Sequence, residues 1–209
     1  MKKKMLKVCG MTDGDNIRKV EEAGADLIGL IFYPGSPRYV KTKPGYLPGN
    51  AKRVGVFVDA DYDAVLETAA SYSLDYVQLH GHESPDYCRA LIRKGLLPDM
   101  IIKAFRIGSL SDFPEAGSYE DLCGMYLFDT KSSLPGGSGK GFDWSLLDSY
   151  HGPVPFLLGG GLGIDCADKL DCLANPFLCG YDVNSRFELA PGLKNVKLLK
   201  EFIEKLSLL

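Results

Sequence analysis

The chain has 209 residues, of which 45% are hydrophobic and 24% are charged, and its formal net charge is −3. The length is enough for a buried core and predicts one domain over residues 1–209. So small a charge gives no broad basic surface for nucleic acid, and no apolar run approaches the roughly 20 residues that cross a bilayer. Residues 2–4 are basic like the start of a signal peptide, but the apolar stretch after them stops at Lys7 and no hydrophobic region follows. We therefore expect a cytoplasmic protein that binds neither membranes nor nucleic acid.

Short apolar runs alternate with segments of helical periodicity along the whole chain. The runs predicted to be β-strands are residues 5–9, 27–32, 53–58, 76–79, 100–105, 125–128, 154–158 and 177–183. The segments predicted to be helices are residues 13–23, 61–72, 84–94, 165–173 and 195–206. Asp13 or Asp15 is the candidate N-cap of the first helix. Residues 34–48, rich in Pro, Gly and Lys, are expected to form a loop in place of most of the second helix.

Eight strands that alternate with helical segments predict an α/β protein with a parallel sheet. Two architectures fit this order, a closed barrel and an open doubly wound sheet. Eight units of roughly 25 residues favour the barrel, although 209 residues are compact for it. We therefore expect a single (β/α)8 or TIM barrel with eight parallel strands.

In such a barrel the active site lies at the C-terminal ends of the strands, which selects candidate residues before any motif is considered. The residues at these ends are Cys9, the loop 36–38, Gln78, His80, Asp129, Gly159-Gly160-Gly161 and residues 182–186. The loops after the seventh and eighth strands commonly hold a phosphate group, because glycines let backbone N–H groups approach an anion and a helix start favours negative charge. The three glycines are also compatible with a tight turn alone.

Several other patterns have simpler structural explanations. Taken alone, Cys9 is more typical of a small buried hydrophobe than of a base. His80 and His82 could share a metal ion, but no third ligand has a motif spacing, so we expect no metal. Residues 136–141 lack the first glycine and the Ser or Thr after Lys140 that a P-loop requires. The six cysteines form no C-x-x-C pair and are expected to be free thiols in a reducing cytoplasm.

Several segments together resemble one family, the phosphoribosylanthranilate isomerases. These segments are, in order, Lys7-Val8-Cys9-Gly10-Met11-Thr12, Ser36-Pro37-Arg38-Tyr39-Val40, Gly55-Val56-Phe57-Val58, Val77-Gln78-Leu79-His80-Gly81, Asp129 with Gly136-Gly137-Ser138-Gly139-Lys140-Gly141-Phe142-Asp143-Trp144, Gly160-Gly161-Leu162, Asp182-Val183-Asn184-Ser185, Glu188 and Pro191-Gly192-Leu193-Lys194. Each match is weak alone, but their order over residues 7–194 is specific for the family.

The resemblance implies an Amadori rearrangement, in which an acid protonates the furanose ring oxygen and a base removes the adjacent C2′ proton. It assigns the base to Cys9 and the acid to Asp129, and it implies no cofactor because no redox step occurs. Lys7, two residues before Cys9 on the same face of a strand, is expected to lower the pKa of the thiol. The segment 130–140 is expected to close over the substrate and exclude water.

The resemblance also implies that the binding partner is a small phosphorylated substrate. The residues expected to bind it are Lys7, Arg38, Gln78, His80 and Asp182. Arg38 is expected to pair with the carboxylate of the anthranilate group, whose geometry suits a guanidinium fork. The residues expected to hold the phosphate are Gly160, Gly161, Asn184 and Ser185.

Two positions depart from the family pattern. The family commonly has D-V-S-S-G-[VI]-E after the eighth strand, whereas this chain has Arg186 in place of the glycine. Arg186 therefore either contacts the phosphate or faces solvent. The segment Gly163-Ile164-Asp165 replaces the family's usual Pro and Asn. Asp165 is expected to cap the following helix, with its carboxylate pointing away from the phosphate.

Two other functions are weighed against this one. The first is another phosphosugar barrel, such as an indole-glycerol-phosphate synthase or a ribulose-phosphate epimerase, but neither the lysine and glutamate of the one nor the metal ligands of the other are evident. The second is a barrel that binds a phosphorylated metabolite without turning it over, and Cys9 with Asp129 argues against it. The sequence leaves open whether the chain is a monomer or a homodimer.

Overall fold

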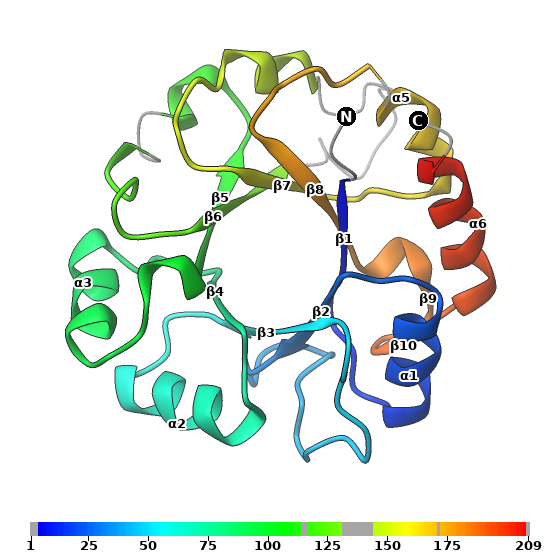
Figure 1. Cartoon of the computed structure of the whole chain (residues 1–209), viewed down its shortest axis with the longest axis horizontal. Coiled ribbons are helices and arrows are strands. Elements are labelled where there is room, and N and C mark those ends of the chain that lie inside the picture. The colour runs from blue at the N-terminus through cyan, green and yellow to red at the C-terminus, as the bar shows by residue number, and fades with distance from the viewer. Residues whose placement is uncertain (1–3, 114–116, 131–143, 171, 208–209) are drawn as a thin grey trace.

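Eight parallel strands close into a barrel in the order β1 to β8, as Figure 1 shows in a view down the barrel. The structure is a computed structural model that describes residues 4–113, 117–130, 144–170 and 172–207. The strands are β1 (Met5–Val8), β2 (Leu27–Ile31), β3 (Lys52–Phe57), β4 (Tyr76–Leu79), β5 (Ile101–Ile107), β6 (Met125–Thr130), β7 (Phe156–Gly159) and β8 (Leu178–Val183). β8 pairs with β1 from Met5 opposite Gly180 to Val8 opposite Val183, which closes the ring. The predicted barrel is confirmed, and the open doubly wound sheet is excluded.

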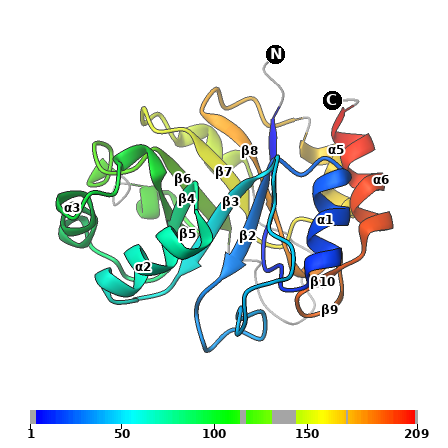
Figure 2. The ribbon, with the colours of Figure 1, turned by 60° about the horizontal axis from the view of Figure 1, so that its bottom comes forward.

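The helices surround the strands and cover their outer face (Figures 1 and 2). In the part of the chain that the structure describes, the α-helices are α1 (Gly14–Glu22), α2 (Tyr62–Tyr72), α3 (Pro85–Arg93), α5 (Ala167–Leu170) and α6 (Val196–Ser207). α6 packs beside α1, so the end of the chain returns to its beginning. Residues 32–51, all of which the structure describes, contain no helix between β2 and β3, as the Pro-rich and Gly-rich segment predicts.

The structure shows which residues cap the starts of the helices after β1 and β7. The Asp13 carboxylate accepts a hydrogen bond from the backbone N–H of Asn16 at 2.7 Å, so Asp13 caps α1 and Asp15 lies in its first turn. The prediction that Asp165 caps the helix after β7 is wrong. That segment begins with a 3₁₀ turn at Ile164–Cys166, and Asp165 lies inside the turn with its carboxylate directed to Arg186. The predicted helix 165–173 is correspondingly reduced to the turn and the short α5.

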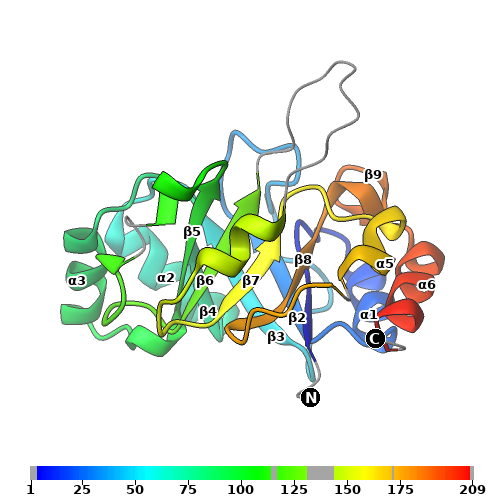
Figure 3. The ribbon, with the colours of Figure 1, turned by 90° about the horizontal axis from the view of Figure 1, so that it is seen from above.

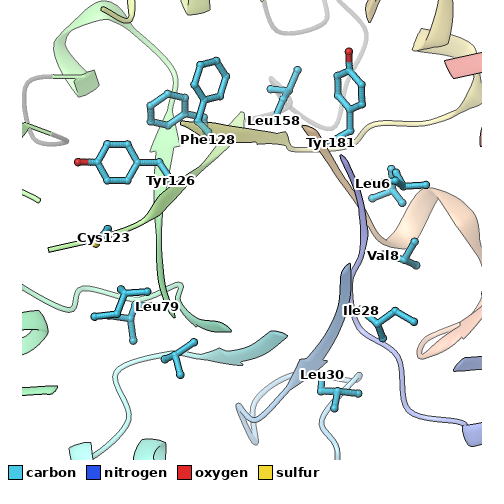
Figure 4. Packing of buried hydrophobic residues seen from close by; sticks show 14 of the residues in the cluster. Leu6, Val8, Ile28, Leu30, Leu79, Cys123, Tyr126, Phe128, Leu158 and Tyr181 are labelled. Atoms are coloured by element: carbon cyan, nitrogen blue, oxygen red, sulfur yellow. The ribbon is translucent and has the colours of Figure 1, made fainter. Parts of the chain in front are cut away.

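Side chains alternate between the two faces of each strand and form two apolar layers. The outer layer packs against the helices, and Figure 4 shows Leu6, Val8, Ile28 and Leu30 pointing away from the centre of the ring. The inner layer fills the barrel with Leu27, Val54, Val56, Ile102, Leu127 and Leu157. Because these side chains pack the interior, a ligand site is expected at the ends of the strands rather than inside the barrel.

The strands β5 and β6 extend beyond the apolar runs from which they were predicted. The sequence prediction ended β5 at residue 105 and β6 at residue 128, but the pairing continues through Arg106 opposite Asp129. Asp129 is therefore inside β6 rather than after it, with its backbone held on both sides by β5 and β7. Polar side chains at the rim of a barrel do not interrupt the ladder, because only the backbone makes it.

A short antiparallel hairpin follows β8. Its strands are β9 (Glu188–Ala190) and β10 (Leu193–Lys194), with Lys194 opposite Glu188. Figure 3 shows β9 at the end of the barrel away from the chain's N-terminus, which is the end where the strands finish. The hairpin thus brings two charged residues to the side of the barrel where a site is expected.

Candidate active site

A pocket of about 320 Å³ lies at the C-terminal ends of the strands. Its lining residues come from the ends of the strands and the loops that follow them. They are Cys9, Ile31, Tyr33, Ser36, Val56, Val58, Gln78, His80, Asp129, Gly160, Gly161, Leu162, Asp182, Asn184, Ser185 and Arg186. The pocket is where the fold rule for barrels predicts an active site.

Most of the predicted site residues meet in this pocket. The nine that line it are Cys9, Asp129, Gln78, His80, Asp182, Gly160, Gly161, Asn184 and Ser185. Lys7 and Arg38 do not line it. Lys7 is fully buried beneath Cys9 and Asp182, and Arg38 is bound to Glu188.

Lys7 and Cys9 lie on the same face of the chain at β1, and Asp182 is opposite Lys7 on β8. The Lys7 Nζ donates to Asp182 Oδ1 at 2.9 Å. Burial lowers the pKa of Lys7, but the Asp182 carboxylate and Cys9 together raise it by more than burial lowers it. The pKa of Lys7 therefore lies above its ordinary value. Lys7 is therefore a fixed positive charge under the thiol.

The prediction that Lys7 gives Cys9 a lowered pKa is wrong for the protein without substrate. Burial raises the pKa of the Cys9 thiol, because a thiolate loses hydration inside the protein. Lys7 lowers it and Asp182 raises it again, and the net pKa lies above its ordinary value. The cation acts in the expected direction, but desolvation outweighs it.

Asp129 and His80 lie next to each other in the lining of the pocket. The His80 Nε2 lies 3.5 Å from Asp129 Oδ2, and the His80 Nδ1 lies 2.7 Å from Gln78 Nε2. With the Gln78 amide donating to Nδ1, the proton of a neutral His80 is on Nε2 and points to Asp129. The other amide atom, Gln78 Oε1, is buried and has no hydrogen-bond partner among the described residues. Gln78 thus presents an acceptor that a bound molecule can use.

The loops after β7 and β8 form the opposite wall. Gly160 and Gly161 follow β7 with φ of 93° and 73°, a left-handed turn that brings the backbone to the pocket. Asn184 and Ser185 follow β8 and begin a 3₁₀ turn at Ser185–Phe187. The Asn184 Oδ1 accepts a hydrogen bond from Lys194 Nζ at 2.7 Å, which fixes the amide of Asn184.

A buried charge network lies behind this wall. Glu188 accepts hydrogen bonds from Arg38 Nε at 2.8 Å, Arg38 Nη2 at 2.6 Å and Lys194 Nζ at 2.5 Å. Burial raises the pKa of Glu188, but the hydrogen bonds from Arg38 and Lys194 lower it by more, so that the pKa of Glu188 is about 2. Lys194 is fully buried, and burial lowers its pKa despite Glu188. Sequence reasoning placed Glu188 and Lys194 only within matched segments and assigned them no contact.

The pocket also has an apolar wall that the sequence prediction missed. Ile31 ends β2, and Val56 lies near the end of β3, followed by Val58. The rule that selected polar residues at strand ends applies to these positions too, but their apolar character assigned them to the core. Such a wall suits the ring of an aromatic ligand.

Some sequence features cannot be placed. Residues 131–143, which include Lys140 and the glycine-rich segment 136–141, lie outside the described residues, so the predicted closing segment stays a prediction. Within the described part of the chain, no group of three or more His, Cys, Asp or Glu side chains is arranged to hold a metal ion. The helices that the structure describes are too short or too polar to cross a membrane.

A closed barrel with a pocket at its C-terminal strand ends defines the (β/α)8-barrel enzymes as the class of this protein. The family model of N-(5'phosphoribosyl)anthranilate (PRA) isomerase matches residues 6–205. The N-(5'-phosphoribosyl)anthranilate isomerase of Phocaeicola vulgatus is 45% identical over 203 residues, covering 97% of this chain and 98% of that protein.

Solved structures agree with this match. The phosphoribosyl anthranilate isomerase from Thermotoga maritima superposes with a TM-score of 0.81 at 34% identity, covering 98% of this chain and 99% of that one. A phosphoribosyl anthranilate isomerase in complex with reduced 1-(o-carboxyphenylamino)-1-deoxyribulose 5-phosphate has a TM-score of 0.77 at 31% identity, with 98% and 99% covered. The chain belongs to the phosphoribosylanthranilate isomerase family and is an isomerase of tryptophan biosynthesis. The predicted family and enzyme class are confirmed.

Proposed function

We propose that Cys9 and Asp129 carry out the isomerisation of N-(5-phosphoribosyl)anthranilate to 1-(2-carboxyphenylamino)-1-deoxyribulose 5-phosphate in this chain. The observation that carries the proposal is a buried thiol just after β1 and a carboxyl group on β6 that face one pocket. A thiol and a carboxyl group supply the base and the acid that the reaction needs. A relative was crystallised with reduced 1-(o-carboxyphenylamino)-1-deoxyribulose 5-phosphate, a molecule of the same class as the proposed product.

The proton transfers balance without a redox step. Asp129 donates a proton to the furanose ring oxygen, the C1′–O bond breaks with its electron pair going to that oxygen, and a Schiff base forms. The Cys9 thiolate then removes the C2′ proton, and the C–H electrons form the double bond of an enolamine. The enolamine tautomerises to the ketone of the product as its C2′ hydroxyl group loses a proton and C1′ gains one. A proton then passes from the Cys9 thiol through solvent to the Asp129 carboxylate, which restores the base and the acid. Because no electrons are gained or lost overall, the reaction needs no cofactor.

The proposed base, Cys9, depends on the positive charge of the buried Lys7 beside it. Cys9 must lose its proton to act, and burial opposes this loss. The ammonium group of Lys7, held by Asp182 at 2.9 Å, stabilises the thiolate that forms. We therefore assign Lys7 as a positioning residue that acts through Cys9 rather than as a residue that touches substrate.

Polar groups around the pocket are suited to the rest of the substrate. We assign the phosphate to Gly160, Gly161, Asn184 and Ser185, whose loops follow β7 and β8. Gln78 Oε1 is an acceptor for a substrate O–H or N–H group, and the Nε2 of His80 orients Asp129. Asp182 Oδ2 is available to a ribose hydroxyl because its bond to Lys7 uses Oδ1.

Arg38 is proposed, as the sequence predicts, to bind the carboxylate of the anthranilate group, but Glu188 occupies part of its guanidinium group. Its Nε and Nη2 are bound to Glu188, which leaves Nη1 as the edge for a carboxylate. A Cβ on Gly10 would lie 2.5 Å from Arg38 Cδ, so Arg38 packs directly on the residue after Cys9. The aromatic ring of the substrate then lies against Ile31, Val56 and Val58.

Turnover of N-(5-phosphoribosyl)anthranilate by the purified chain tests the proposal. The loss of anthranilate-type fluorescence should follow enzyme concentration, and Cys9→Ser and Asp129→Ala should each remove nearly all of it. A wild-type chain without turnover would overturn the proposed activity. Full turnover in either variant would leave the activity and remove that residue from its role.

A further inference from the structure

The two departures of this chain from the family pattern contact each other. Arg186 lies in the turn after β8 and Asp165 in the turn after β7, and Arg186 Nη2 donates to Asp165 Oδ1 at 2.7 Å. Both turns lie in the segments after β7 and β8, which also contain the residues assigned above to the phosphate, Gly160, Gly161, Asn184 and Ser185. The prediction left open whether Arg186 faces solvent or the phosphate, and the structure places it in the lining of the pocket.

Gly163 makes the pair possible. A Cβ on Gly163 would lie 2.6 Å from Asp165 Oδ1, 3.0 Å from Arg186 Nε and 3.1 Å from Arg186 Nη2. The guanidinium therefore packs against the bare backbone of Gly163. Residues 163, 165 and 186 form one unit, in which Gly163 provides space, Asp165 holds one edge of the guanidinium and Arg186 faces the pocket.

The charges of the pocket point to an anion as the partner of Arg186. Among the described residues that line the pocket, Arg186 is the one lysine or arginine, and Asp129 and Asp182 are carboxylates. The other nearby cations are engaged elsewhere, with Lys7 on Asp182, Arg38 on Glu188, and Lys194 on both Glu188 and Asn184. Among the described residues that line the pocket, Arg186 is thus the one positively charged Lys or Arg side chain that a phosphate dianion meets.

The guanidinium has donors to spare. Arginine carries five N–H groups in a planar fork, and the bond to Asp165 uses Nη2. Both side chains of the pair are about half exposed or more, at 52% and 66%, so the ion pair itself stabilises the fold little. Its effect is to restrict the rotamers of Arg186 beside the phosphate loops before substrate binds.

We propose that Arg186 is a phosphate-binding residue of this chain and that Asp165 is the positioning residue that holds it across Gly163. The proposal rests on the phosphate site assigned under the proposed function. It adds one charged contact to a site otherwise made of glycine backbone, an amide and a hydroxyl. The ligand class is a phosphate monoester, here the 5-phosphate of the ribose.

Steady-state kinetics with Arg186→Gln, which keeps the length and loses the charge, tests the contact. We expect KM for N-(5-phosphoribosyl)anthranilate to rise roughly tenfold and kcat to stay within about twofold. The matched control is Arg89→Gln, because Arg89 forms a similar exposed pair with Asp86 at 2.8 Å on α3, away from the pocket. Its kinetics should equal wild type. An unchanged KM in Arg186→Gln overturns the proposal.

Asp165→Asn tests the positioning role. Arg186 keeps its charge in this variant but is no longer held, so KM should rise by about twofold to fivefold, less than in Arg186→Gln. The double variant should be no worse than Arg186→Gln alone, because Asp165 acts through Arg186. A KM that falls in Asp165→Asn would show that Asp165 competes with phosphate, and would overturn its assigned role.

Titration calorimetry with inorganic phosphate separates this inference from the proposed function. We expect wild type and Arg89→Gln to bind phosphate about tenfold more tightly than Arg186→Gln, with a steeper loss of affinity in added salt. This result supports the contact even if turnover fails. Equal binding by all three proteins overturns the role of Arg186 while the isomerase activity stands. Absence of binding to wild type overturns both the phosphate site and the role of Arg186.

Discussion

The two sides of the pocket hold their charges in opposite ways. Beneath Cys9 the side chain of Lys7 is fully buried and that of Asp182 is 12% exposed, whereas at the phosphate loops Arg186 and Asp165 are 52% and 66% exposed. Water screens an exposed pair, while a buried pair can be broken only by leaving a charge without hydration. Buried charges should therefore control protonation and stability, and exposed charges should control affinity.

The largest effect is expected in the buried half. Cys9→Ala removes the proposed base, so kcat should fall by roughly 10²–10⁴. The matched control is Cys88→Ala, which changes another buried cysteine that lies on α3 and outside the pocket. Both variants lose a small buried side chain, and circular dichroism should show both folded, but only Cys9→Ala should lose turnover. If Cys9→Ala keeps more than about a tenth of wild-type kcat, the base is another group.

The buried network behind the phosphate loops should dominate stability. Glu188→Gln removes the anion between Arg38 and the fully buried Lys194, so the free energy of unfolding should fall by about 3–5 kcal/mol. Urea unfolding measures the change. Asp86→Asn, which breaks the exposed pair with Arg89, should cost at most about 1 kcal/mol. If the free energy of unfolding falls by the same small amount in both variants, the buried charges are no more important for stability than the exposed ones.

The same network gives a dependence on pH. The pKa of Glu188 falls from 4.5 to about 2 on folding, so its ionised form stabilises the folded chain. That contribution is fully present above about pH 4.5 and is lost as the pH falls toward 2. The difference in unfolding free energy between wild type and Glu188→Gln should therefore shrink across this window. A difference that stays constant down to pH 2 would contradict the assignment.

The protonation of Cys9 is expected to follow its burial. Because its pKa is raised, the thiolate fraction should increase about tenfold per pH unit from pH 7 to 9 without a plateau. Alkylation by iodoacetamide, followed peptide by peptide with mass spectrometry, measures this fraction. The exposed Cys172, outside the pocket, serves as the internal reference for the reagent. A plateau of the Cys9 rate below pH 8 would mean that Lys7 outweighs burial.

The fold and the chemical groups of the site could be predicted because they depend on local patterns. Short apolar runs between segments of helical periodicity identified eight strands, and the rule that barrels carry their sites at strand ends then selected Cys9, His80 and Asp129. Spacing by two residues correctly placed Lys7 and Cys9 on one face. Strand ends were less accurate, because Arg106 and Asp129 are polar yet pair within the sheet.

The contacts that close the site could not be predicted. Arg38 and Glu188 are 150 positions apart, and their pairing depends on how the hairpin after β8 folds back on the loop after β2. The pKa of Cys9 depends on whether desolvation or Lys7 prevails, which only burial in the folded chain decides. Likewise, the two departures from the family pattern were recognised separately, and their contact at 2.7 Å emerges only in three dimensions.

The proposed pairing of an acid with a base across one pocket is tested most directly by steady-state kinetics of Asp129→Asn. Asparagine keeps the shape of the side chain and an oxygen that can face His80 Nε2, but it has no acidic proton to give to the ring oxygen. The account predicts that kcat falls by roughly 100-fold or more while KM stays within about threefold, the pattern of an interaction made in the transition state. A near-normal kcat with a lowered melting temperature would contradict it, because Asp129 would then hold the end of β6 without donating the proton.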